Sequence, residues 1–210
     1  MKVLIITDSL SLPRDTSETW DNTYVKKLKL YFPEIEFIHF AYGKATTNLF
    51  AMQVKRYYKY IKPDLIIMQC GIVDCTPRVL KHYESKILIK LKLSFILTKK
   101  VKLFIRKYRN LRYVKEEQFR INVNKIKSLF NPSSFMSIGI LPPPLEHENK
   151  VKGIQKIVKS YNSILDEITD LIETTDFPKN GLIDDYVHMN KIGHEYIFNK
   201  IKKEIEQYDN

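Results

Sequence analysis

The 210-residue sequence predicts an α/β domain built on a parallel sheet. Its first 70 residues alternate apolar runs with amphipathic segments in the order strand, helix, strand, helix, strand, which favours parallel pairing with right-handed crossovers. A hydrophobic fraction of 44% and an aromatic fraction of 12% exclude a disordered chain. The length predicts a single domain over residues 1–210 that buries a substantial core.

Apolar runs separated by turn residues mark the elements of this first part. Strands are expected at residues 3–7, 35–40 and 65–68, each followed by polar or turn residues. The spacing of Tyr24, Leu28 and Tyr31 predicts a helix after the first strand. A second helix, capped by Thr46 or Thr47, is expected before the third strand.

A basic segment then interrupts the alternation. Residues 79–112 place aliphatic side chains at helical spacing with lysines on the other faces, which predicts an inserted pair of amphipathic helices. Residues 78–115 contain thirteen basic side chains and one acid, a net charge of +12 within a total of +11. The rest of the chain is nearly neutral, which argues against a general nucleic-acid binder. Three interpretations of this segment stay open: a solvated basic face, a lid that attracts an anionic substrate, or a patch that makes peripheral contact with an anionic membrane.

The pattern of helices and strands resumes after the insertion. Helical spacing extends over residues 119–130 and, most clearly, over residues 154–172. A fourth strand is expected at 135–140, and the prolines of 141–144 make a stiff loop directly after it. Residues 181–184 form a short final segment that could be a strand, and a terminal helix is expected to start near Asn190.

The two cysteines and the lengths of the apolar runs predict the cellular compartment of the protein. Cys70 and Cys75 are too close in sequence for a disulfide framework and have no zinc-ligand spacing, so we expect free thiols in a reducing compartment and no metal site. No stretch has the features of a secretory signal or the length of a spanning helix. A soluble, cytoplasmic protein is therefore expected.

Candidate chemical groups lie near the two ends of the chain. Ser9 follows the first strand, and the carboxyl ends of strands are where open α/β sheets present their ligands and chemistry. Asp185 and His188 precede the last helix with two residues between them, so the two side chains can meet on one turn. A serine, a histidine and a carboxylate are the components of a nucleophilic triad.

Four blocks in this order resemble those of the SGNH (GDSL-type) hydrolases. They are Asp8-Ser9-Leu10, Gly43, Gly71-Ile72-Val73-Asp74, and Asp185-Tyr186-Val187-His188 with the following Asn190, Gly193 and His194. The resemblance spans residues 8–188, and its last block is the most specific. It implies a three-layer α/β/α sandwich with a central five-stranded parallel sheet, of SGNH or flavodoxin-like type, and hydrolysis or transfer of acyl esters without a cofactor.

The resemblance also assigns roles to residues. It implies that Ser9 is the nucleophile, that His188 is its general base, and that Asp185 orients His188. The backbone N–H groups of Ser9 and Gly43 would bind the tetrahedral oxyanion. Candidate substrate-binding residues are Asp8, Asp74, Arg14 and Arg78, and Asp74 either touches substrate or ties its loop through backbone hydrogen bonds.

Two positions depart from the family pattern. Thr7 replaces the glycine of the first block, and Val73 replaces the asparagine that normally supplies an oxyanion donor. Loss of one such donor costs on the order of 10²- to 10³-fold in turnover. Candidate replacement donors are Gln69, Asn48 and Arg78.

Other histidines and acids compete weakly for these roles. His39 is expected in the core and His194 as a support of the catalytic loop, while His82 and His147 fall in loop-like sequence without a named partner. Asp184 is the alternative triad acid.

The preferred interpretation is a serine esterase that removes an O-acyl group, such as acetyl, from a carbohydrate. The third block, which continues Cys75-Thr76-Pro77-Arg78, also looks like a branch of the family associated with bacterial surface-polysaccharide synthesis. One alternative is an O-acyltransferase with the same triad. The other is a non-catalytic protein that binds an anionic glycan or a membrane. Nucleic acid is not expected as a partner, because the basic residues alternate with aliphatics rather than with exposed aromatics.

Overall fold

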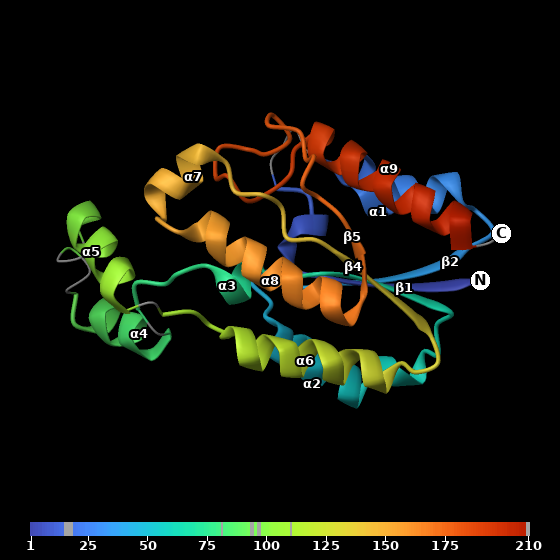
Figure 1. The fold of residues 1–210 in the computed structure, drawn as a ribbon, viewed down its shortest axis with the longest axis horizontal. Coiled ribbons are helices and arrows are strands. Elements are labelled where there is room, and N and C mark those ends of the chain that lie inside the picture. Colours follow the sequence, from blue (N-terminus) through green and yellow to red (C-terminus); the bar gives the residue numbers. More distant parts are fainter. Residues whose placement is uncertain (15–18, 81, 93–94, 96–97, 110, 209–210) are drawn as a thin grey trace.

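The computed structural model shows three layers around one parallel sheet (Figure 1). It describes residues 1–14, 19–80, 82–92, 95, 98–109 and 111–208. The five strands are parallel and lie in the order β2-β1-β3-β4-β5. Their bounds are β1 Lys2–Thr7, β2 Glu36–Ala41, β3 Leu65–Gln69, β4 Ser134–Ile138 and β5 Asp170–Ile172. The predicted three-layer α/β/α fold is confirmed.

Helices cover both faces of the sheet. One face carries α1 (Tyr24–Tyr31) and α9 (Lys191–Tyr208), which pack against each other. The opposite face carries α2 (Thr47–Arg56), α6 (Glu116–Leu129) and α8 (Ile154–Ile168). Short helices complete the described chain: η1 Ser9–Ser11, η2 Trp20–Asn22, η3 Tyr58–Tyr60, α3 Ile72–Cys75 and α7 Leu145–Lys150.

The central strands are buried from both sides. Residues 3–6 of β1 and 65–67 of β3 have no exposed surface. Near-continuous apolar runs of this kind are typical of parallel strands, because helices cover both faces of such a sheet. The polar residues that follow β1 and β3 are thus delivered to the carboxyl edge of the sheet.

The insertion after β3 forms two helices, α4 (His82–Lys90) and α5 (Lys99–Arg109). They project from one end of the molecule, away from the sheet (Figure 1). Glu84 on α4 accepts two hydrogen bonds from Arg109 on α5, at 2.7 and 2.9 Å. The positions 81, 93–94, 96–97 and 110 of the predicted insertion lie outside the described residues. None of the helices in the described ranges is long and apolar enough to cross a bilayer.

The end of the sheet differs from the prediction. The fifth strand is β5 at residues 170–172, and not the segment 181–184, which makes only an isolated bridge between Leu182 and Met189. Leu171 and Ile172 continue the helical spacing of α8 in the sequence, but the helix ends at Ile168. Its cap, Thr169, has an extended backbone, and its side chain donates to the carbonyl of Leu165. The helix therefore turns directly into the strand.

Candidate active site

Ser9 lies at the carboxyl end of β1, at the start of the short helix η1. The preceding Asp8 has an extended backbone, and its side chain accepts a hydrogen bond from the Leu10 N–H at 2.9 Å. An aspartate in this cap position ends the strand and turns the chain sharply. The side chain of Ser9 is consequently held at the edge of the sheet.

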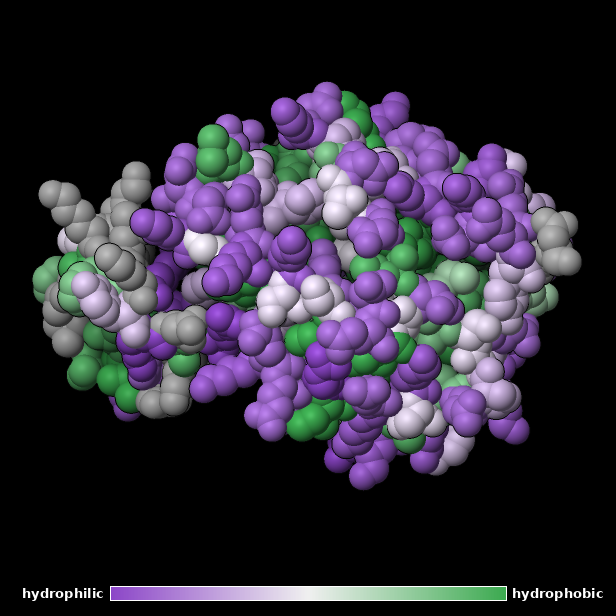
Figure 2. Space-filling view, viewed as in Figure 1, coloured by the Kyte–Doolittle hydropathy of each residue, from purple (hydrophilic) through white to green (hydrophobic). Residues whose placement is uncertain are grey.

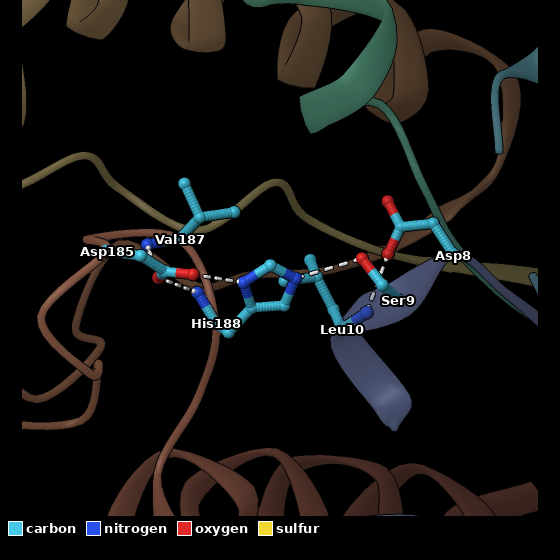
Figure 3. A network of polar contacts seen from close by, with 6 residues as sticks. All are labelled: Asp8, Ser9, Leu10, Asp185, Val187 and His188. Carbon is cyan, nitrogen blue, oxygen red and sulfur yellow. Dashed lines mark hydrogen bonds and ion pairs between the residues drawn. The ribbon is translucent and has the colours of Figure 1, made fainter. Parts of the chain in front are cut away.

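Ser9, His188 and Asp185 form one hydrogen-bonded chain (Figure 3). The Oγ of Ser9 lies 2.9 Å from Nε2 of His188, and Nδ1 of His188 lies 2.5 Å from Oδ2 of Asp185. Asp184, the alternative acid, is exposed, and the imidazole pairs with Asp185 instead. The structure thus brings together the three side chains that the sequence analysis proposed from opposite ends of the chain.

The carboxylate of Asp185 is held by its own loop. Oδ1 accepts hydrogen bonds from the backbone N–H groups of Val187 and His188, each at 2.9 Å. Partial burial alone would raise its pKa, but these bonds and the imidazole hold the pKa of Asp185 below its ordinary value. Tyr186 has a φ of 63°, in the left-handed region, which folds the loop tightly around the carboxylate. Asp185 therefore stays ionised beside the histidine.

The start of α9 fixes this loop. The Oδ1 of Asn190 accepts the N–H groups of Ile192 and Gly193 at 3.0 and 3.2 Å, and its Nδ2 donates to the carbonyl of Asn180 at 2.7 Å. A Cβ at Gly193 would lie 2.3 Å from the carbonyl oxygen of Gly181, so only glycine fits there. The asparagine and glycine of the last block thus position His188 by capping and close packing.

The predicted oxyanion donors are the N–H groups of Ser9 and Gly43. Among the described residues, neither N–H has a hydrogen-bond acceptor. Gly43 lies exposed in the turn after β2, where Tyr42 donates to the carbonyl of Thr7 at 3.0 Å. This bond ties the Gly43 turn to the end of β1, next to Ser9.

The three candidates for replacing the missing asparagine occupy different places. Gln69 is 1% exposed and accepts the Tyr24 hydroxyl, with its Nε2 buried and lacking a partner in the described part of the chain. Asn48 accepts a bond from Asn122 on α6 and faces that helix. Arg78 donates from Nη2 to the carbonyl of Val73, at 3.2 Å. Of the three side chains, that of Arg78 contacts the loop that carries Val73.

Asp8 and Asp74 are the two acids among the predicted substrate-binding residues. Both side chains are fully buried. The Oδ1 of Asp74 accepts the backbone N–H and the hydroxyl of Thr47, at 2.9 and 2.6 Å, so it ties the third block to α2. Burial raises the pKa of Asp8 to about 7 and that of Asp74 to about 6, and the nearby carboxylate of Asp74 adds to the effect on Asp8. Both carboxylates tie the loops that carry them, and contact of either with a substrate stays a prediction.

The arginines lie around the site. Arg14 is exposed and close enough to Asp8 to lower its pKa in part. Arg78 stacks over the ring of Tyr113 at 4.5 Å. Arg106 of α5, which the sequence analysis did not single out, donates to the carbonyl of Lys150 at 3.4 Å, and burial together with nearby Arg78 lowers its pKa. The two guanidinium groups are therefore neighbours.

Of the other histidines, His39 is partly buried and His194 is buried. His39 lies within 3.0 to 3.2 Å of the hydroxyls of Ser11 and Thr7, and burial lowers its pKa to about 4. His194 is 1% exposed, with a pKa lowered to about 4 by burial and by Lys27. The side chain of His82 lies outside those described. His39 and His194 therefore stay neutral at pH 7.

His147 is a site residue that sequence reasoning missed. It lies in α7, beneath the prolines of 141–144, and is 6% exposed. With residues on either side of the triad it lines a cavity of about 10 Å³. The other residues around this cavity are Leu10, Ile72, Leu141, Pro143, Tyr186 and Val187. Pro144 in the cap of α7 was the available signal, because proline favours the start of a helix.

Alternative chemistry finds little support in the described residues. Cys70 and Cys75 are buried free thiols, and burial raises the pKa of both well above the ordinary value, so neither is a ready nucleophile. No group of three acidic, histidine or cysteine side chains in the described ranges could hold a metal ion. A serine bonded to a histidine that is bonded to a carboxylate can instead attack an acyl carbon directly.

A parallel sheet with this chain of side chains at its carboxyl edge has the layout of a serine hydrolase. Comparison with solved structures agrees at the level of the fold. A lipase/acylhydrolase from Enterococcus faecalis superposes with a TM-score of 0.71 at 15% identity, covering 99% of this chain and 96% of that one. An acetyl-xylooligosaccharide esterase from Geobacillus stearothermophilus gives 0.66 at 14% identity, covering 97% and 93%. The chain therefore has the fold of the SGNH hydrolases.

A third similar structure is the esterase EstA from Pseudoalteromonas sp., with a TM-score of 0.62 at 14% identity, covering 100% of this chain and 99% of that one. By sequence, no family model matches the chain. No curated protein matches it either. The likeness thus lies in the three-dimensional arrangement, because the sequences have diverged.

Proposed function

We propose that this protein is a serine esterase that removes short O-acyl groups, such as acetyl, from a carbohydrate. The observation that carries the proposal is the hydrogen-bonded chain from Ser9 through His188 to Asp185. The similarity in fold to lipases and to acetyl xylan esterases supports the class of reaction.

The geometry fits acyl transfer through serine. Ser9 Oγ attacks the ester carbon while Nε2 of His188 takes its proton, and Asp185 stabilises the imidazolium. The N–H groups of Ser9 and Gly43 bind the oxyanion. Collapse of the tetrahedral intermediate expels the alcohol, which receives the proton from His188. Water then attacks the acyl-serine with His188 again as the base, which releases the acid and restores the serine.

The size of the acyl group follows from the cavity between Leu10 and Val187. Its volume of about 10 Å³ is close to that of one water site, and its walls are mostly apolar. A space of this size favours a methyl group over a longer chain. The cavity therefore supports an acetyl ester as substrate.

Two neighbouring arginines, Arg78 and Arg106, support an anionic carbohydrate as the substrate. The Nε atoms of Arg78 and Arg106 are buried and have no partner among the described residues. No described carboxylate forms an ion pair with either guanidinium. Two neighbouring cations in a partly buried place repel each other, and a bound carboxylate or phosphate would neutralise them. An acidic carbohydrate would supply such a group.

The test compares wild type with Ser9→Ala on nitrophenyl acetate, butyrate and octanoate, with a fluorophosphonate to label an activated serine. We expect the acetate to be hydrolysed fastest, and both turnover and label to vanish in Ser9→Ala. Ser128→Ala, a change of an exposed serine on α6, is the matched control. Labelling of another serine, or equal turnover by Ser9→Ala, would refute the triad.

Gly43 tests the oxyanion site. Nothing lies within 4 Å of a Cβ built there, so Gly43→Ala should keep its activity because the N–H remains. Gly43→Pro removes this donor, with a ring that also fixes φ at position 43, and should lower kcat by about 10²-fold. Equal kcat values for the two variants, in folded samples, would exclude Gly43 as a donor.

Kinetics on acetylated oligosaccharides test whether the substrate is an acidic carbohydrate. Arg78→Ala should raise KM for a uronic-acid substrate more than for a neutral acetylated xylooligosaccharide, while Arg56→Ala on α2 should change neither. Mass detection of acetyl transferred to an added glycan, with little free acetate, would indicate the O-acyltransferase instead.

A further inference from the structure

We propose that the α4–α5 lobe, residues 82–109, docks this protein onto the anionic surface of a lipid bilayer. This inference is independent of the esterase proposal. It rests on the exposed side chains of the lobe, on its charge and on its place in the fold.

The lobe exposes large apolar side chains. The exposed fraction of these side chains ranges from 52% for Ile87 to 74% for Phe95. Figure 2 shows hydrophobic atoms gathered beside hydrophilic ones on the lobe at the left of the molecule. Burial of such side chains would be favourable by roughly 1.5 to 3 kcal/mol each. The exposed set is Ile87, Ile89, Leu91, Phe95, Phe104 and Tyr108.

Exposed lysines lie next to part of this apolar set in the sequence. Lys86, Lys90 and Lys92 are exposed and alternate with Ile87, Ile89 and Leu91 along the chain. The sequence between residues 78 and 115 has only Glu84 as an acid, and Glu84 is paired with Arg109 within the lobe. The surface thus combines apolar groups with excess positive charge.

An anionic bilayer complements both properties. Its headgroups attract lysine and arginine, at about 1 kcal/mol per residue near the surface, and its acyl boundary accepts aromatic and aliphatic side chains. A second copy of this lobe would bring two net charges of +8 together, which disfavours self-association. A nucleic acid would neutralise the lysines but leave Ile87, Ile89 and Leu91 in water.

The lobe is joined to the catalytic side of the molecule. Arg106 of α5 contacts the carbonyl of Lys150 at the end of α7, and Arg78 pairs with Leu111 in an antiparallel bridge at the base of the lobe. The Nζ of Lys150 lies 4.2 Å from the ring centre of Tyr186, next to Asp185. Docking through the lobe would therefore place the Ser9 side of the sheet near the membrane surface.

Vesicle sedimentation tests the proposal. Vesicles of phosphatidylcholine with about 30% phosphatidylglycerol should bind the full chain at least tenfold more tightly than vesicles of phosphatidylcholine alone. Joint reversal of Lys86, Lys90 and Lys92 to glutamate should weaken binding by at least about 10²-fold. The matched control reverses three exposed lysines elsewhere, Lys55, Lys62 and Lys125, and should bind like wild type within a few-fold.

A second pair of variants separates insertion of apolar groups from charge alone. Ile89→Ser with Phe104→Ser should weaken binding about tenfold or more, while Leu30→Ser with Tyr60→Ser, which removes equally exposed groups elsewhere, should not. Circular dichroism confirms that each variant is folded. Equal binding to both vesicle types, equal loss in the control variants, tight binding to RNA in place of vesicles, or a dimer formed through the lobe would overturn the proposal.

Discussion

Leu10 and Ile72, beside Ser9, are buried against the domain, whereas Ile89 and Phe104 of the α4–α5 lobe face solvent. The charges differ in the same way. At the carboxyl edge of the sheet, Asp185 is bonded to His188, while the lobe gathers lysines around a single acid. The edge is thus complete within the chain, and the lobe has surface left for a partner. We therefore expect substitutions at the carboxyl edge to leave vesicle binding unchanged, and substitutions of exposed side chains in the lobe to leave turnover unchanged.

The largest expected effect is on turnover. His188→Ala removes the base and should lower kcat on nitrophenyl acetate by at least about 10⁴-fold. Vesicle binding should stay at the wild-type level, since His188 lies outside the lobe. Steady-state kinetics and sedimentation on one preparation check both statements. A variant that lost both properties would show that the two regions are coupled.

A smaller effect, in the opposite direction, is expected at Val73. Val73→Asn restores a side-chain donor at the position where the resemblance expects one, and should raise kcat on simple esters by up to about 10²-fold. Val73→Ala is the control, because it changes the side chain without adding a donor. If Val73→Asn were no faster than Val73→Ala, another group already fills the oxyanion site.

Asp8 should show its burial as a dependence of stability on pH. Its folded pKa of about 7 lies above the ordinary 3.8, so the folded state binds more protons between these values, and stability falls as pH rises through that window. Asp8→Asn keeps a side-chain oxygen that accepts the Leu10 N–H. It removes the free-energy cost of ionising a buried carboxylate. The variant should exceed wild type at pH 8 by on the order of 4 kcal/mol, with little difference at pH 4.

Urea unfolding at several pH values measures this difference. Asp166→Asn, at an exposed position, is the control. A gain in stability that did not change with pH would assign the effect to packing and not to ionisation.

The smallest expected effect is that of salt concentration. It distinguishes the carboxyl edge of the sheet from the α4–α5 lobe without a mutation. Raising the salt concentration from about 0.1 M to about 0.5 M screens exposed charges and should release the protein from anionic vesicles. Hydrolysis of an uncharged ester should change less than about twofold, because the Ser9–His188 contact is largely shielded from salt. Parallel loss of hydrolysis would place the lobe in the catalytic step.

The positions of β1 to β4 along the chain and the place of Ser9 could be predicted because both depend on local patterns. Apolar runs mark β1 and β3, and Ser9 directly follows the first of them. The C-terminal block likewise pointed to Asp185 and His188, which the structure joins to Ser9, although their catalytic roles remain a prediction.

Other features depend on contacts that sequence spacing does not encode. Leu171 and Ile172 match the period of α8 but pair with β4, because the chain has already turned at Thr169. The complete burial of Asp8 and Asp74 also could not be foreseen, since a carboxylate is ordinarily exposed. The proximity of Arg106 to Arg78 required the path of the inserted helices.

The contact between Ser9 and His188 joins residues that are 179 positions apart. During synthesis, the serine leaves the ribosome early and its base arrives only with the start of α9. A partly made chain therefore lacks the Ser9–His188 hydrogen bond, which forms only when the last helix has packed beside α1. The hydrogen-bonded chain of Ser9, His188 and Asp185 is thus among the last contacts that the growing chain can complete.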